Sequence, residues 1–302
     1  MGAPRRPHAR AGPIRPYGVR VLRERRGTGA HAVGRVLLGA AVVLAVGAVV
    51  LVRFWGPREP EPAADTAAQA VPPAELREAA GQRVFIGHMS IGWNLLDGLD
   101  RLYAARGVDE AQVVQVTVDD PVAEVPEGQG AVIHAEIGVN GDPMGKLANF
   151  DTAMRSGLAD EVDVAMVKLC YTDVTAATDV DRLFAAYRQT LDELQRDHPD
   201  VRFIHATVPL TAAPSGIKQH LKVLVRGDDN DARERFNDLV REAYADDDLF
   251  DIAAVESTAA DGTRLASLAP GWADPDRQHL NPAGSAVLAA RFLDVLTQGA
   301  PA

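Results

Sequence analysis

The chain has 302 residues, of which 47% are hydrophobic and 24% are charged, and its formal net charge is −11. This composition excludes a disordered chain and supplies enough apolar side chains for at least one sizeable core. Residues 1–35 contain nine arginines and a single acid, Glu24, so they carry +8 and the rest of the chain carries −19. Because the body of the protein is acidic, we expect no nucleic-acid partner.

An uninterrupted apolar segment follows the basic N-terminus at residues 36–52 and contains no charged or polar side chain. As a helix it would be roughly 26 Å long, close to the thickness of a bilayer core. Arginines flank it on both sides, and Phe54 and Trp55 are suited to the membrane interface. We therefore predict a transmembrane helix over residues 36–55. The basic segment 1–35 would be cytoplasmic, and the C-terminal domain would lie outside the plasma membrane.

Proline, alanine and glutamate dominate residues 56–73, which predicts an extended linker. A cleaved signal peptide is the main alternative, but the cleavage-like Ala68-Gln69-Ala70 lies far downstream of the apolar segment. The single cysteine, Cys170, cannot form an intramolecular disulfide, which is compatible with a site outside the cytoplasm. Residues 74–302 are then expected to form one folded domain.

Short apolar runs alternate with amphipathic stretches throughout this domain, a pattern typical of a parallel sheet covered by helices. Strands are expected near residues 83–86, 112–116, 131–137, 163–169, 201–208 and 250–255. Helices are expected at residues 93–105, 145–156, 179–196, 231–245 and 282–296, the last capped by Asn281. These elements predict a flavodoxin-like, three-layer α/β/α domain with a mostly parallel sheet. Its ligand site would lie at the carboxyl ends of the strands.

A turn bracketed by glycines follows the first expected strand, at residues 87–94, and presents Ser90 at the start of a helix. The N–H groups and positive dipole of a helix N-terminus suit an oxyanion beside a serine nucleophile. A serine that opens a helix is nevertheless far more often a simple N-cap. Ser90 is therefore a candidate nucleophile only if a base and an acid accompany it.

Both kinds of partner occur before the last expected helix, where Asp276 precedes His279 by three residues. A serine nucleophile needs a base to take its proton and an acid to orient that base. A second glycine-containing stretch, Gly138-Val139-Asn140-Gly141-Asp142, follows the third expected strand. Its glycines would allow the backbone to approach a ligand closely, although a plain surface turn is the alternative.

Together these motifs resemble the SGNH branch of the GDSL esterase/lipase superfamily, over roughly residues 80–298. The Gly-His-Met-Ser turn resembles the family's first block but is one residue longer than the usual Gly-Asp-Ser. Gly141 matches the glycine of the second block, and Asp276-x-x-His279 closely matches the fifth. The resemblance implies that Ser90 is the nucleophile, His279 the general base and Asp276 the group that orients the imidazole. It implies no cofactor.

The third block departs from the family pattern, because Cys170-Tyr171-Thr172-Asp173 stands where the family has Gly-x-Asn-Asp. The asparagine that donates to the oxyanion is therefore missing from that position. The resemblance leaves the N–H groups of Ser90 and Gly141 as donors. Asn140 or the Thr172 hydroxyl could replace the asparagine, or the oxyanion hole is weaker. Loss of one donor typically lowers the rate about 10² to 10³-fold.

Four further side chains near strand ends are candidates for lining a pocket: His88, Thr172, Asp173 and His205. A lone histidine in a strand is more often structural than functional. The acidic runs at residues 228–231 and 246–248 lack the spacing of a calcium loop, so no metal site is expected.

These features predict a membrane-anchored, extracytoplasmic serine hydrolase that acts on an ester through an acyl-enzyme. An O-acylated glycan or another envelope component is the substrate that this location suggests. An acyltransferase with the same three residues remains an alternative, as does a catalytically impaired domain that binds an envelope ligand or partner.

Overall fold

The computed structural model describes residues 70–298 of the chain. In chain order its helices and strands are α3 (Pro73–Ala80), β1 (Arg83–His88), α4 (Ile91–Arg106), β2 (Gln112–Gln115), β3 (Ala131–Glu136), α5 (Pro143–Arg155), β4 (Val164–Val167), α6 (Val180–Asp197), β5 (Arg202–Ala206), α7 (Gly216–Arg226), α8 (Asp229–Ala243), β6 (Leu249–Phe250), α9 (Ile252–Ser257) and α10 (Pro282–Gln298). Short 3₁₀ turns at Leu158–Asp160 and Asp246–Asp248 complete it.

The predicted transmembrane helix, residues 36–55, and the basic segment before it lie outside the described residues. Among residues 70–298, no helix combines the length and apolar character needed to cross a membrane.

The six strands form one sheet in the order β2-β3-β1-β4-β5-β6, and every neighbouring pair is parallel. This confirms the prediction of an α/β domain with a parallel sheet. The chain starts the sheet in the middle, at β1. Outward from β1, β3 and then β2 lie on one side and β4, β5 and β6 on the other, so the direction in which strands are added reverses at β1. In doubly wound sheets such a reversal opens a crevice at the carboxyl ends of the strands, and the segments that follow β1, β3 and β4 all meet there.

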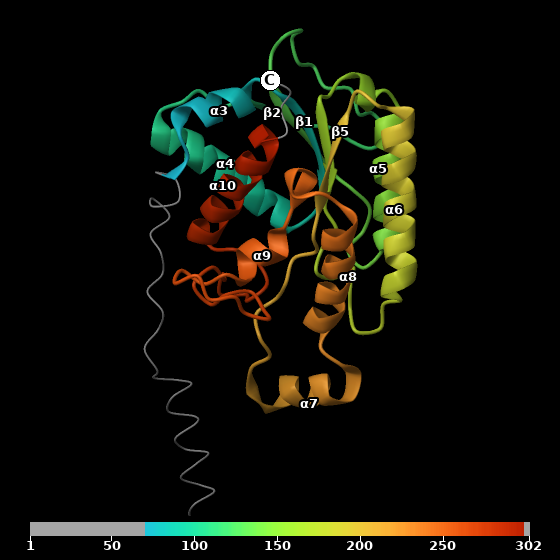
Figure 1. The fold of residues 1–302 in the computed structure, drawn as a ribbon, viewed down its shortest axis with the longest axis vertical. Helices are drawn as coiled ribbons and strands as arrows, with labels where there is room; N and C mark the ends of the chain where they lie inside the picture. The colour runs from blue at the N-terminus through green and yellow to red at the C-terminus, as the bar shows by residue number, and fades with distance from the viewer. Residues whose placement is uncertain (1–69, 299–302) are drawn as a thin grey trace, which may run out of the picture. The chain divides into compact units, whose positions relative to one another are not determined.

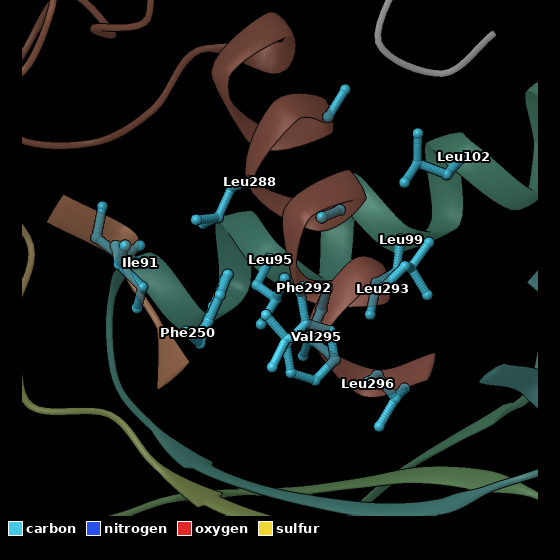
Figure 2. Packing of buried hydrophobic residues seen from close by; sticks show 14 of the residues in the cluster. Ile91, Leu95, Leu99, Leu102, Phe250, Leu288, Phe292, Leu293, Val295 and Leu296 are labelled. Carbon is cyan, nitrogen blue, oxygen red and sulfur yellow. The ribbon is translucent and has the colours of Figure 1, made fainter. Parts of the chain in front are cut away.

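Helices cover both faces of the sheet, so the domain has three layers (Figure 1). One apolar cluster joins α3, α4, α9 and α10 to the sheet, and a second joins α5, α6 and α8 to the other face. Figure 2 shows the first cluster, in which Leu95 and Leu99 of α4 pack with Phe292 and Leu293 of α10. The two helices approach so closely that a Cβ on Gly98 would lie 2.2 Å from the Ser285 carbonyl oxygen.

The sequence prediction was wrong at residues 250–255, which were expected to form a strand. Only Leu249–Phe250 pairs as β6, and α9 begins immediately afterwards. Asp251 ends the strand, because its side chain caps α9 by accepting a hydrogen bond from the Ala254 N–H at 2.9 Å. Helices α3, α7 and α9 were not predicted. Val71, which the prediction placed in the linker, is buried in the first apolar cluster.

Candidate active site

Ser90 lies in the turn between β1 and α4, at the carboxyl edge of the sheet. Its φ of 54° falls in the left-handed region, which costs a non-glycine residue about 1–3 kcal/mol, and residues strained in this way cluster at functional sites. The buried Lys168 ammonium donates to the Met89 carbonyl at 2.8 Å and so stabilises the turn. The Ser90 N–H at the start of α4 has no protein acceptor within residues 70–298.

The fold brings Ser90 together with two residues from the far end of the chain. Ser90 Oγ lies 2.5 Å from Nε2 of His279, and His279 Nδ1 donates to Oδ2 of Asp276. Oδ1 of Asp276 accepts the N–H groups of Gln278 at 2.9 Å and of His279 at 3.0 Å. Burial raises the pKa of Asp276, but these hydrogen bonds outweigh burial and hold its pKa below the usual range. The carboxylate is therefore ionised and fixed against the imidazole at neutral pH.

Backbone contacts hold the loop that carries Asp276 and His279. The Asp274 N–H donates to the His279 carbonyl at 2.8 Å and closes the loop on itself. Arg277, with a φ of 65°, accepts the Ala212 N–H at 3.0 Å and donates through its guanidinium to the Ala213 carbonyl at 2.6 Å. The segment after β5 thus positions the histidine relative to the serine.

The Asp173 carboxylate, which is fully buried, organises the neighbouring loops. Its Oδ1 accepts the Gly141 N–H at 2.8 Å. Its Oδ2 accepts both the Lys146 ammonium at 2.7 Å and the Cys170 N–H at 2.6 Å. The structure therefore departs from the expectation for Gly141: the N–H group expected to bind the oxyanion is already bound to the carboxylate of Asp173.

Lys146 also donates to Oδ1 of Asn140, at 2.9 Å. An ammonium can only donate, so the amide oxygen of Asn140 must face it and the NH₂ group must point elsewhere. That NH₂ group has no protein acceptor in the part of the chain that the structure describes. Oγ1 of Thr172 is covered by protein and likewise has no partner there. Of the two substitutes expected for the missing asparagine, Asn140 is the one already oriented by a partner.

His88, one of the expected pocket residues, is instead fully buried. Its Nε2 lies 3.1 Å from Nδ1 of His134, and the ring of Trp93 packs edge-on against both imidazoles. Burial, with the nearby charge of Lys168, lowers the pKa of His88 to about 3, so the ring is neutral. His88 is the last residue of β1, two residues before Ser90, and it has a structural role there.

His205 and Asp173 were also expected in the pocket, and both are packed inside the fold. The His205 ring stacks on Tyr244, with 3.4 Å between the ring centroids, and its pKa is lowered to about 4 by burial. Asp173 is enclosed by its contacts with Lys146 and Gly141. Of the four expected pocket residues, Thr172 is the one that lines the cleft beside the loop of Asp276 and His279.

This cleft, of about 520 Å³, adjoins the histidine loop. Asp276 belongs to its lining, whereas Ser90 and His279 lie beyond its edge. Most of the other side chains around it are polar or charged, and they include Tyr171, Thr172, Thr175, Thr211, Gln219, Lys222, Asp228, Asp229, Arg233, Arg277 and Gln278. The cleft therefore suits a hydrophilic molecule better than a long acyl chain.

Three buried cations near the site were missed by the sequence analysis: Lys146, Lys168 and Arg233. Arg233 donates to the carbonyls of Tyr171 and Val174 and supports the loop after β4. No local signal marks these residues, because each lies in a stretch that also reads as an ordinary helix or strand.

The family model described as GDSL-like Lipase/Acylhydrolase matches residues 96–292 of the chain. The matched region includes Gly141, Asp276 and His279 but begins after Ser90. No curated protein matches the chain.

Several solved structures are similar to the chain. A protein from Streptococcus pneumonia described as a platelet activating factor shares 16% identity at a TM-score of 0.45, covering 83% of this chain and 99% of that one. The acetyl xylan esterase AlAXEase shares 17% identity at a TM-score of 0.42, covering 70% and 98%. TM-scores below 0.5 carry no inference about activity. The family model covers well over half of the sequence, and on that basis the chain belongs to the GDSL-like lipase/acylhydrolase family, a family of ester hydrolases.

Proposed function

We propose that the protein is a serine esterase that works through an acyl-enzyme on Ser90. The observation that carries this proposal is the hydrogen-bonded series from Ser90 through His279 to Asp276. Ser90 Oγ attacks the acyl carbonyl while its proton passes to Nε2 of His279, and Asp276 stabilises the imidazolium that results. His279 then protonates the departing alcohol. A water molecule then loses a proton to His279 and attacks the acyl carbon, the bond from that carbon to Ser90 Oγ breaks to release the acid, and His279 returns the proton to Ser90 Oγ.

The oxyanion that forms on the carbonyl needs donors, and we assign the Ser90 N–H and the NH₂ group of Asn140 to this role. Both are without protein acceptors in the described residues, and Lys146 holds the Asn140 amide in one orientation. Asn140 would thus take over the function of the asparagine that the third block lacks. Since the Gly141 N–H is bound to Asp173, it contributes only if that contact opens.

The polar cleft beside the catalytic residues favours an ester whose alcohol is hydrophilic, such as an O-acetylated glycan. Its lining offers hydroxyl, amide and charged groups for binding sugar hydroxyls. The predicted anchor at residues 36–55 would hold such an enzyme at the outer face of the plasma membrane, where envelope glycans occur. That location rests on the sequence, and protease accessibility of the domain in intact cells tests it.

The activity is tested on the full chain with a fluorophosphonate probe and with p-nitrophenyl acetate. We expect labelling and hydrolysis in the wild type, and loss of both in Ser90→Ala. Ser156→Ala, which changes an exposed serine at the end of α5, is the matched control and should behave as the wild type. p-Nitrophenyl palmitate should be a much poorer substrate than the acetate.

A folded wild-type chain that neither reacts with the probe nor hydrolyses the acetate would refute the esterase. That outcome would favour the alternative of a domain that only binds a ligand. If labelling depends on Ser90 but an added alcohol greatly increases acyl turnover, the same acyl-enzyme serves a transferase instead.

A further inference from the structure

Helix α7 differs from every other long helix of the domain, because none of its residues is buried. It connects β5 to α8 and stands apart from the layered body at the carboxyl edge of the sheet (Figure 1). Four large apolar side chains on it are exposed: Ile217 by 82%, Leu221 by 56%, Leu224 by 81% and Val225 by 81%. Exposed aliphatic residues gathered on one short helix mark a contact surface.

The arrangement of side chains around α7 is strongly amphipathic. At 3.6 residues per turn, the four apolar side chains lie within an arc of about 100°. The basic residues Lys218, Lys222 and Arg226 occupy the arc directly beside it. Lys222 lies 3.9 Å from Asp229, whereas Lys218 and Arg226 form no ion pair within the described residues. The helix therefore presents an apolar face bordered on one side by three basic residues, of which Lys218 and Arg226 are unpaired within the described residues.

We propose that α7 binds the surface of an anionic lipid bilayer. An amphipathic helix of this kind inserts its apolar face at the boundary between headgroups and acyl chains, while its basic side contacts anionic headgroups. The charge of the molecule supports this orientation: the chain beyond residue 35 carries −19, so an anionic bilayer repels most of the domain and attracts α7.

A second copy of the chain fits this face less well than a bilayer does. A symmetric contact would bring α7 of both copies together and place Lys218, Lys222 and Arg226 near their own counterparts. Four aliphatic side chains on one short helix also provide far less than the roughly 800 Å² per partner of a stable interface.

The side of α7 away from the apolar face borders the polar cleft. Gln219, Lys222 and Val223 line the cleft together with Tyr171 and Asp276. A docked α7 would therefore lie between the bilayer and the cleft, and would hold the cleft about one helix diameter, roughly 10 Å, from the membrane surface. The docking itself does not depend on the proposed esterase activity.

The proposal is tested with the full chain reconstituted into vesicles and an environment-sensitive fluorophore attached at Leu224→Cys. The native Cys170 is fully buried, so labelling is directed to the new cysteine. The matched control carries the label at Gln189→Cys, on the exposed surface of α6. Vesicles contain phosphatidylcholine alone or mixed with phosphatidylglycerol, and both carry a lipid-borne quencher.

We expect the Leu224 label to shift to the blue and to be quenched in anionic vesicles, and much less so in neutral ones, while the Gln189 label is unaffected. The charge-reversed variant K218E/R226E should lower the ratio of docked to free α7 by at least about 25-fold, taking a factor of roughly five for each of the two positive charges lost. I217S should weaken quenching through the apolar face alone.

Equal, weak quenching of the two labels in anionic vesicles would overturn the proposal. Quenching that K218E/R226E leaves unchanged would overturn it as well. A lipid-independent blue shift that grows with protein concentration would assign the face to a second copy of the chain. Esterase activity has no part in these readouts, so failure of docking and failure of the proposed function are separable.

Discussion

The buried pair of Lys146 and Asp173 offers a quantitative test of how the site is built. Both side chains are 0% exposed, their charged atoms are 2.7 Å apart, and Asp173 also accepts the N–H groups of Gly141 and Cys170. We consider Lys146→Met, Asp173→Asn and the double variant. Each single change leaves an uncompensated charge or an unmatched donor in the interior.

Removing one partner of a buried ion pair typically destabilises a protein by about 3–5 kcal/mol, because the remaining charge stays desolvated. Lys146→Met leaves Asp173 with two N–H donors, so we expect about 3 kcal/mol. Asp173→Asn leaves the ammonium with only neutral acceptors and turns an NH₂ group toward a backbone donor, so we expect about 4 kcal/mol. In the double variant both charges are gone, so its loss of unfolding free energy should be smaller than the sum of the two single losses by at least about 2 kcal/mol.

The free energy of unfolding is measured by urea denaturation, followed by circular dichroism and tryptophan fluorescence. Turnover of p-nitrophenyl acetate by Lys146→Met provides a second readout, since Lys146 also orients Asn140. We expect kcat to fall about tenfold or more with little change in KM, because an oxyanion donor acts in the transition state. The account of the pair would be refuted if each single variant lost less than about 1 kcal/mol of unfolding free energy, or if the loss in the double variant equalled the sum of the two single losses.

Three further predictions follow from individual residues. Burial raises the pKa of Glu256 to about 8, so the folded state keeps a proton that the unfolded state loses above its pKa of about 4.3. The free energy of unfolding should therefore fall as pH rises from about 5 to 8, by up to about 1.4 kcal/mol per pH unit. Glu256→Gln should flatten this pH dependence, and identical pH dependences of the wild type and the variant would contradict the prediction. Gly98→Ala places a Cβ 2.2 Å from the Ser285 carbonyl oxygen, so it should lower the free energy of unfolding by about 2 kcal/mol despite the better helix propensity of alanine. An unchanged melting temperature would count against the close contact between α4 and α10. Asn140→Ala should lower kcat about 10²-fold, whereas Thr172→Val, which removes an unpartnered hydroxyl, should preserve both rate and stability; the reverse pattern would make Thr172 the donor.

Local patterns in the sequence were sufficient to predict most of the domain. Alternation of apolar runs with amphipathic stretches indicated a parallel α/β sheet, and five of the six predicted strands and all five predicted helices occur within a few residues of their expected positions. The cap of α10 was also readable, because Asn281 accepts the Gly284 N–H at 2.9 Å as predicted. Such signals depend on neighbours in the chain, so a single sequence contains them.

Motif order in the sequence also singled out Ser90, Asp276 and His279. Their contact was decided by the tertiary structure, since Ser90 and His279 are 189 residues apart and meet only when the sheet and α10 are assembled. The same holds for the engagement of Gly141 by Asp173, which depends on a side chain 32 residues away.

Burial was the property that the sequence alone could not decide. Lys146 and Lys168 look like ordinary charged residues in the chain, yet the fold encloses both and supplies acceptors from distant segments. Conversely, the aliphatic residues of α7 look like core residues, and the fold leaves them exposed. Periodicity shows which face of an element is apolar, but only the packing of all elements determines whether another part of the protein covers that face.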